Sequence, residues 1–332
     1  MPGTDTGTGT GTGTDIGTGA GTGMDGRPRA VTVGLDGSAE SRAAVDWAVR
    51  EARLLGLPLR LVHVRKPVPE RGGRASPAGT DDRRHGDERR GAERMVREVA
   101  EDVRARHSGL DVIVEQLSGR PAEVLARAAL GSEPLVLGSR GLSGIGGFLV
   151  GSVGLSVVAH AERPVVLVRA GAKAADEYEA GPTGTPSAAK PFRPVVLGLD
   201  AEQPDEEVIG FAFAAAARRA TSLRVVHGWT PPAYYAYGLS VDLELHGDLM
   251  SQETSTLTEV LRPWCAKFPD VEVTAESSYG TPGDHLADAS REASLVVVGR
   301  RNRRSAFGTH IGPVTHAVLH HSAAPVAVVP HD

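Results

Sequence analysis

The sequence predicts an α/β fold built from two tandem, doubly wound domains, each with a five-stranded parallel sheet. Three observations predict this fold. The 332 residues suffice for two domains of ordinary size. Segments of the first half recur in the same order in the second half. Within each half, short apolar runs alternate with longer segments of helical period, which is typical of parallel strands covered by helices on both faces.

The internal repeat consists of five matched segments. Two segments recur with one common offset, "VTVGLD" (31–36) as "VVLGLD" (195–200) and "LRLVHV" (59–64) as "LRVVHG" (223–228). Three more recur with a second, slightly shorter offset, "GRPAEVL" (119–125) as "GTPGDHL" (280–286), "LVLGSRG" (135–141) as "VVVGRRN" (296–302) and "PVVLV" (164–168) as "PVAVV" (325–329). We therefore predict one domain at 27–170 and a second at 193–331.

Two segments lie outside the repeat. Residues 1–26 alternate Gly with Thr and contain almost no apolar side chains, so they cannot offset the entropy of folding. We expect a disordered tail there. Residues 171–192 are rich in Gly, Pro and small side chains and have no apolar period, so we expect a linker.

The elements of the first half follow from its apolar period. Alternating strands and helices are expected at 30–35, 38–56, 58–64, about 90–107, 111–117, 121–130, 134–138, from about 151, and at 164–169. Right-handed crossovers between such strands give an open sheet. Ligands of these sheets bind beyond the carboxyl ends of the strands, so residues at those ends are the candidates for function.

Composition excludes several classes of protein. The formal charge of −5 argues against a general nucleic-acid-binding surface. The single cysteine, Cys265, excludes a disulfide framework and a cysteine-based zinc site. There is no signal-peptide pattern and no apolar run of the roughly 18 residues that a transmembrane helix needs. We expect a soluble, cytoplasmic protein that contacts neither membrane nor nucleic acid.

A glycine pattern in the first half predicts a phosphate site. Gly138, Gly141 and Gly151 follow the strand at 134–138, with Ser152 after the last glycine at the start of a helix. Glycines let a ligand approach the main chain closely. The N–H groups at a helix N-terminus favour anions such as phosphate. A phosphate-bearing ligand is therefore expected at this loop.

This Gly-x2-Gly-x9-Gly-Ser string resembles the ATP-binding loop of the universal stress protein family. The "VGLD" start, the strand ending in "HV", the "GRP" turn and the closing "PVVLVR" also resemble that family. The resemblance implies an adenine-nucleotide alpha hydrolase-like fold and ATP as the ligand, with or without Mg²⁺. It also implies that the last strands pair, either in an intramolecular pseudo-dimer or in a homodimer.

The resemblance further implies which residues bind the nucleotide. Asp36 and Val64 would contact the ribose and the adenine. The other expected contacts are Gly34, Leu137, Gly138, Arg140, Gly141, Gly151, Ser152 and Val153, with the last three holding the phosphates.

Some of these residues have a simpler interpretation. Ser38 is best explained as the N-cap of the first helix, and Ser152 could be only a cap for the last helix of its domain. His63, on an apolar strand, is best explained as a partnered core histidine. Ser152 also stands where a P-loop has its lysine, so binding is predicted and fast hydrolysis is not. No catalytic residue and no metal ligand is predicted.

The second half departs from the pattern. Its loop has Asn302 in place of the middle glycine and Pro313 in place of the serine, and Gly228 stands where the first half has Val64. Proline has neither an N–H nor a hydroxyl, so we predict that this half binds ATP poorly. The arginines of "GRRNRRS" (299–305) leave open the capture of an anion through side chains.

Three functions are compatible with these features. The leading hypothesis is an ATP-binding stress regulator that responds to nucleotide in its first domain. The second is an enzyme that uses the same cleft, either a slow ATPase or a nucleotidyl transferase. The third is an interaction module that binds no nucleotide.

Overall fold

The structure is a computed structural model that describes residues 29–65, 81–140, 150–181, 187, 189–229, 243–302 and 311–332. The expected N-terminal tail and the expected contact Gly141 lie outside these ranges. Of the first domain's glycine pattern, the described residues therefore include Gly138 and Gly151.

The first domain alternates strands and helices as its apolar period predicts. Its elements are β1 (Ala30–Gly34), α1 (Ala39–Leu55), β2 (Leu59–Arg65), α2 (Asp81–Arg106), β3 (Val112–Ser118), α3 (Pro121–Ala128), the short helix η1 (Ala129–Gly131), β4 (Ser132–Ser139), α4 (Ser152–His160) and β5 (Val165–Arg169). Helix α2 begins at Asp81, well before the expected position near 90. Its first turns are charged and carry no apolar period, so periodicity alone misses them.

The second domain repeats this order. Its elements are β6 (Val195–Gly198), α5 (Glu206–Arg219), β7 (Leu223–Trp229), α6 (Leu243–Lys267), β8 (Val273–Tyr279), α7 (Pro282–Ala289), the short helix η4 (Ser290–Glu292), β9 (Leu295–Arg301), α8 (Pro313–His321) and β10 (Val326–His331). The elements keep the offsets of the repeated segments. Strand β7 follows β2 by the offset of the first two segments, and β8, α7 and α8 follow β3, α3 and α4 by the offset of the last three. Equivalent positions can therefore be compared residue by residue.

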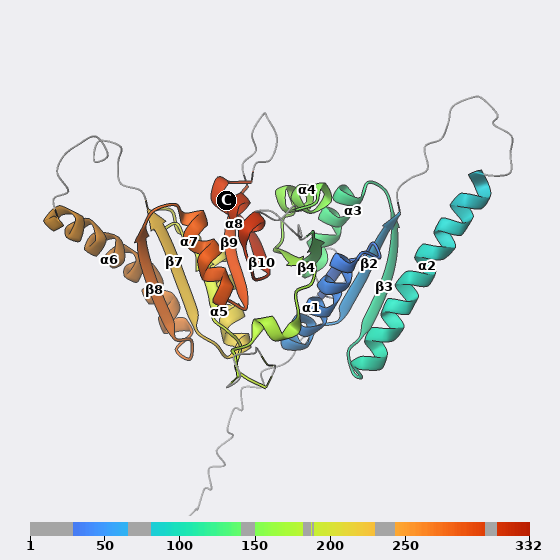
Figure 1. Ribbon diagram of the computed structural model, residues 1–332, viewed down its shortest axis with the longest axis horizontal. Coiled ribbons are helices and arrows are strands. Elements are labelled where there is room, and N and C mark those ends of the chain that lie inside the picture. Colours follow the sequence, from blue (N-terminus) through green and yellow to red (C-terminus); the bar gives the residue numbers. More distant parts are fainter. Residues whose placement is uncertain are drawn as a thin grey trace, which may run out of the picture.

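Ten strands form one sheet, in the order β3-β2-β1-β4-β5-β10-β9-β6-β7-β8. The pairing is parallel within each domain, and β10 pairs antiparallel with β5, with Val326 opposite Leu167. Figure 1 shows the two domains on either side of this central pair, with α2 and α6 at the outer ends. The last strands thus pair inside one chain, as expected for an intramolecular pseudo-dimer.

Helices cover both faces of the sheet, so the fold is doubly wound. Successive residues of β4 point to opposite faces: Val136 packs in a core with α1 and α2, whereas Leu135 and Leu137 pack in a second core with α3 and α4. The second domain divides its core in the same way. Both faces of the inner strands are therefore buried, which explains the continuous apolar runs of the sequence, whereas the outermost strands β3 and β8 are partly exposed.

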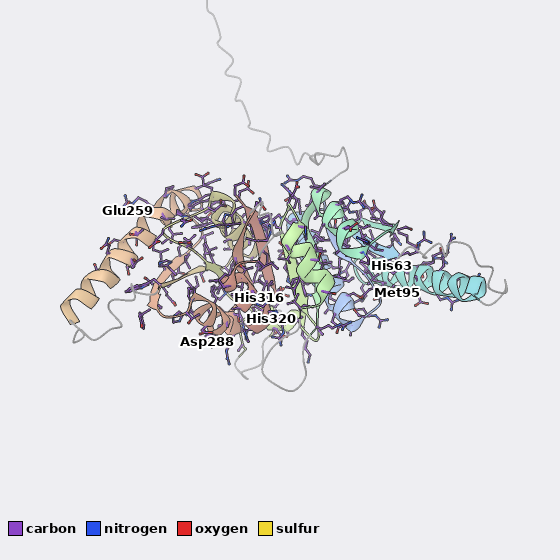
Figure 2. All side chains as sticks on the ribbon, turned by 90° about the horizontal axis from the view of Figure 1, so that it is seen from above. His63, Met95, Glu259, Asp288, His316 and His320 are labelled. Atoms are coloured by element: carbon purple, nitrogen blue, oxygen red, sulfur yellow. The ribbon has the colours of Figure 1, made fainter. Side chains whose placement is uncertain are left out.

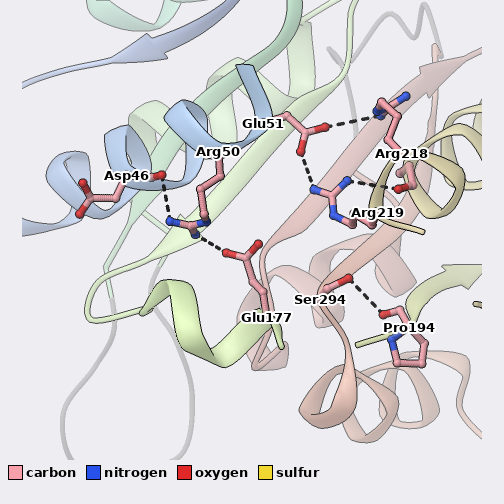
Figure 3. A network of polar contacts seen from close by, with 9 residues as sticks. Asp46, Arg50, Glu51, Glu177, Pro194, Arg218, Arg219 and Ser294 are labelled. Atoms are coloured by element: carbon pink, nitrogen blue, oxygen red, sulfur yellow. Dashed lines mark hydrogen bonds and ion pairs between the residues drawn. The ribbon is translucent and has the colours of Figure 1, made fainter. Parts of the chain in front are cut away.

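Buried charges also join the two domains (Figure 3). Arg219 of α5 donates to Glu51 of α1 at 2.5 Å, and the two side chains are only 1% and 2% exposed. The Arg219 guanidinium also lies 5.9 Å from the ring centre of Trp47. From the linker, Glu177 accepts a hydrogen bond from Arg50 of α1. Removing one partner of such a buried pair would leave the other charge buried and unpaired, which is strongly destabilising.

Two arginines cap helices across the domain boundary. Arg300 of β9 donates to the carbonyl of Ala161, the C-cap of α4, at 2.5 Å. Arg169 of β5 donates to the carbonyl of Ser322, the C-cap of α8, at 3.1 Å. Burial lowers the pKa of both guanidiniums. A cation at a helix C-terminus is stabilising, so each domain supports the last helix of the other.

Within the ranges that the structure describes, no helix combines the length and the apolar character needed to cross a membrane.

Candidate functional site

The strand order reverses between β1 and β4 in the first domain. At such a switch point the chains leaving the two strands diverge, which opens a crevice beyond their carboxyl ends. Gly34 ends β1 and Asp36 follows it, while Gly138 lies at the end of β4. The fold therefore brings these three residues, expected from different parts of the sequence, to one edge of the sheet.

Two glycines at this edge are required by packing. A Cβ added at Gly34 would lie 2.6 Å from the Leu137 side chain, which is itself in the core. A Cβ added at Gly138 would lie 2.5 Å from the carbonyl oxygen of Glu40, in the first turn of α1. Gly138 therefore lets α1 approach β4, and its presence alone is no sign of a ligand.

Gly151 is different because neither its conformation nor its packing against the described residues explains it. It is the N-cap of α4, with φ −61° and ψ 152°, angles that any residue can adopt. A Cβ there would meet no atom of the described residues within 4 Å. The absence of a side chain leaves the main chain at this helix start open to close approach.

Ser152 and Val153 follow as the first two residues of α4, and both are exposed. The interpretation of Ser152 as a cap is wrong, because the N-cap is Gly151. The first N–H groups of a helix have no partner within the helix and carry partial positive charge. Gly151, Ser152 and Val153 thus present donors and a hydroxyl at the end of α4 that favours anions.

Asp36, after the end of β1, is held in place by Ser38. Its Oδ1 accepts hydrogen bonds from the Ser38 main-chain N–H at 3.0 Å and from the Ser38 hydroxyl at 2.6 Å. Burial raises the pKa of the Asp36 carboxyl, but the hydrogen bonds from Ser38, from Ser41 and from the main chain together outweigh it, and the net shift is downward. Asp36 is therefore an ionised acceptor at neutral pH. Ser38 also accepts from the Ser41 N–H, which confirms its role as the N-cap of α1.

His63 has a structural role, as predicted. Its Nδ1 donates to the Leu35 carbonyl at 2.8 Å and ties β2 to the chain leaving β1. His227 makes the same bond to the Leu199 carbonyl at 2.9 Å in the second domain. Both histidines have a carbonyl partner, and the same contact recurs in the two domains.

The end of β2 adds a polar pair that sequence reasoning missed. Val64 is half-buried and packs against the part of the core that α3 and α4 cover. The next residue, Arg65, donates to the Ser118 hydroxyl at 3.2 Å. Arg140, expected from the loop, is exposed after β4. The signal available in the sequence was the position of Arg65, directly after an expected contact at a strand end.

The equivalent edge of the second domain encloses a cavity of about 600 Å³. Gly312 keeps the N-cap geometry of Gly151, with φ −61° and ψ 157°, but Pro313 occupies the first helical position. A Cβ added at Gly228 would lie 2.6 Å from Cα of Pro282, so Pro282 fills the space that a valine would need. The second domain therefore keeps an open cavity although Pro313 has removed an N–H and a hydroxyl from the start of α8.

Helix α8 also carries two histidines side by side (Figure 2). The rings of His316 and His320 lie 4.4 Å apart, and burial together with the neighbouring histidines lowers the pKa of His316. Across the described part of the chain, no group of three or more His, Cys, Asp or Glu side chains is placed to hold a metal ion.

Comparison with known proteins identifies the family. The model of the universal stress protein family matches residues 28–169 and again 191–330. A universal stress protein of Mycolicibacterium smegmatis is 30% identical over 303 residues, covering 90% of this chain and 96% of its own. One of Mycobacterium tuberculosis is 30% identical over 331 residues, covering 91% of this chain and 96% of its own.

A solved structure shares the fold of the whole tandem. A universal stress protein from Archaeoglobus fulgidus matches with a TM-score of 0.64 and 19% identity, covering 91% of this chain and 98% of that chain. With both halves matched by the family model and relatives that align over nearly their full length, the chain belongs to the universal stress protein family.

Proposed function

We propose that the protein is an ATP-binding regulator whose first domain holds the nucleotide, and whose occupancy changes the conformation or the partners of the paired domains. One observation carries this proposal. At the start of α4, Gly151 is required neither by its backbone angles nor by the packing of the described residues, and it is followed by Ser152, whereas the equivalent Gly312 is followed by Pro313. A ligand that approaches the main chain closely there favours a glycine.

The proposal assigns a role to each part of the crevice. The phosphates lie at the start of α4, near the N–H groups of Ser152 and Val153. The ionised Asp36 accepts from the ribose hydroxyls, and Val64 borders the adenine. Mg²⁺ usually reaches such sites bound to phosphate oxygens and water. It would arrive with ATP, because the described residues form no cluster of metal ligands of their own.

Regulation fits the site better than fast hydrolysis does. A P-loop places a lysine on the outer phosphates, and Ser152 stands at that position here. Serine supplies a hydroxyl but no positive charge for the transferred phosphoryl group. We therefore propose that bound ATP persists long enough to act as a signal, with turnover below the roughly 1 per second of slow ordinary enzymes.

Equilibrium dialysis of labelled ATP against the full chain tests the proposal. Wild type should bind ATP in the micromolar to low millimolar range. Gly151→Val should weaken binding, because the added side chain blocks approach to the helix start. Gly312→Val is the matched control, since Gly312 has the same angles and the same open surroundings in the second domain. It should leave ATP affinity unchanged.

Two results would overturn this proposal. One is the absence of ATP binding to wild type at millimolar concentration. The other is equal loss of affinity in Gly151→Val and Gly312→Val. Turnover measured on the same samples, if it is well above about 1 per second, would favour the enzyme hypothesis instead.

The proposal also includes the assembly and its location. Strands β5 and β10 already pair with each other, so we propose that one chain is the functional pair. Light scattering should then give the mass of a single chain, 34.6 kDa, and a doubled mass would point to a homodimer through another surface. We also propose a cytoplasmic location, where ATP is supplied.

A further inference from the structure

The cavity of the second domain has the size of a small-molecule site. Its volume of about 600 Å³ lies between the carboxyl ends of β6 and β9 and the helices α5, α7 and α8. Small-molecule sites usually range over about 300–1,000 Å³ and have mainly apolar walls. Apolar side chains line this one from four elements and the loop before α8: Val208, Val226, Leu286, Val298 and Ile311. A ring-bearing molecule of about the size of a nucleoside fits such a space.

Two aromatic side chains lie at the mouth of this cavity, at positions where the first domain has polar side chains. Trp229 lines the cavity, and its ring centre lies 6.1 Å from that of Tyr279, edge to face. Tyr279 is 57% exposed. The equivalent residues of the first domain are Arg65 and Ser118, which form a hydrogen bond. An aromatic pair favours contact with another ring, whereas an arginine favours an anion.

The wall beside the cavity is also more acidic than its counterpart in the first domain. Residues 36–42 carry a formal charge of −1, and the equivalent residues 200–206 carry −4. Two of the added carboxylates, Glu202 and Asp205, line the cavity. Like charges close together repel, so this wall disfavours a polyphosphate.

The basic side chains that the structure describes at the cavity already have partners. Arg301 pairs with Asp200 at 3.2 Å, and His331 faces Asp205 at 3.4 Å. Arg300 donates to the Ala161 carbonyl of the first domain. A phosphate would have to compete with these partners for each of these basic side chains.

The helix start has also lost donors. Pro313 has no N–H, and Thr315 commits its hydroxyl to the Gly299 carbonyl at 2.8 Å. From the cavity, the aromatic pair, the charge and the missing donors, we propose that the second domain binds an uncharged, ring-bearing molecule of about nucleoside size in place of a nucleotide. Binding at this site does not depend on ATP binding in the first domain.

Calorimetry with adenosine, AMP and ATP tests this inference, because the three probes share one ring and differ in charge. The full chain is used with Asp36→Ala and Gly151→Val, which disable the first-domain site at both ends. Adenosine should bind this double variant, and ATP should bind at least tenfold more weakly than adenosine. AMP should fall between them.

Trp229→Ala in the same background should weaken adenosine binding by about tenfold or more, since stacking on an aromatic side chain typically contributes that much. Trp229→Phe should restore most of the affinity, which separates loss of the ring contact from loss of folding. Arg65→Ala, at the matched position of the first domain, should change nothing.

Three outcomes would overturn the inference: no adenosine binding at millimolar concentration, ATP binding as tight as that of adenosine, or adenosine binding that Trp229→Ala leaves intact. A failure of ATP to bind wild type would overturn only the function proposed for the first domain. The two proposals therefore fail separately.

Discussion

The two domains have the same fold and the same switch point, but their helix starts differ in chemistry. Gly151 and Gly312 cap α4 and α8 with nearly identical angles. Ser152 follows one and Pro313 the other, and proline is as good as serine at the first position of a helix. Backbone shape and binding chemistry are therefore separable: a domain can keep the form of a nucleotide site after losing its donors.

The glycines at the ends of β4 and β9 make the same point. Gly138 is required because the main chain of α1 approaches it, but α5 begins later in its domain. Gly299 instead faces the His331 ring and the Val208 side chain, at 2.8 Å and 3.2 Å from an added Cβ. A glycine shared by the two halves of a repeat can thus serve different neighbours.

Exchange of the residue after the cap should have the largest effect. Ser152→Pro removes one N–H and one hydroxyl, each contributing about 1.5–3 kcal/mol to a charged ligand. We expect ATP affinity to fall by about 10²–10⁴-fold, measured by equilibrium dialysis, with little loss of stability.

The reverse exchange is the control for this prediction. Pro313→Ser, in a chain that also carries Gly151→Val, should restore little ATP binding, because Glu202 and Asp205 remain beside the cavity. Strong ATP binding in that variant would show that this one residue alone accounts for the difference in ATP affinity between the two domains.

Adding a side chain at the glycine that lies at the end of β4 should have the next largest effect, which is on the stability of the fold. Gly138→Ala places a Cβ against the main chain of Glu40, which cannot move without shifting α1. Overpacking of this kind costs about 1–3 kcal/mol, so the urea midpoint should fall. Gly299→Ala should cost less, because its neighbours are side chains. Equal midpoints for the two variants would contradict this account.

Removal of the arginine caps across the boundary should have a smaller effect. Arg300→Met leaves the C-terminus of α4 without its cation, at a cost of about 0.3–2 kcal/mol. Hydrogen exchange should then quicken in α4, which lies in the other domain. Arg169→Met should quicken exchange in α8 instead, and Arg300→Lys should restore part of the protection. Faster exchange confined to the mutated domain would show that the caps do not couple the domains.

The pH dependence that comes from Asp36 should be the smallest effect. Because its pKa is lowered on folding, the ionised carboxyl stabilises the native state above the ordinary value of about 3.9 and loses this effect as pH falls through the folded pKa. Wild type should therefore melt higher than Asp36→Asn near pH 7, and the two should converge in acid. A difference in melting temperature that is constant between pH 3 and 7 would contradict the sign.

Most of the fold could be predicted because the internal repeat and the apolar period are both visible in the sequence without knowledge of tertiary contacts. The positions of the last strands, the switch point and the N-cap Ser38 follow from such patterns. The pairing of the last strands with each other was implied by the family resemblance. The charged start of α2 has no apolar period, so its position was missed. The Glu51–Arg219 pair and the Arg300 cap join residues far apart in the chain, and no local spacing marks them.

The site was harder to predict because one residue type serves several purposes. Gly138 and Gly151 look alike in sequence, yet packing explains only the first. The cavity of the second domain was also missed, because the loss of donors at Pro313 says nothing about the space that β6, β9 and α7 enclose. Only the surroundings of each residue separate these cases.

The number of ATP molecules bound per chain at saturation tests the difference between the domains most directly. Equilibrium dialysis of the full chain should give one ATP per chain, and Ser152→Pro should abolish it. Two ATP molecules per chain, or a single one that survives Ser152→Pro, would contradict the assignment of the nucleotide to the first domain.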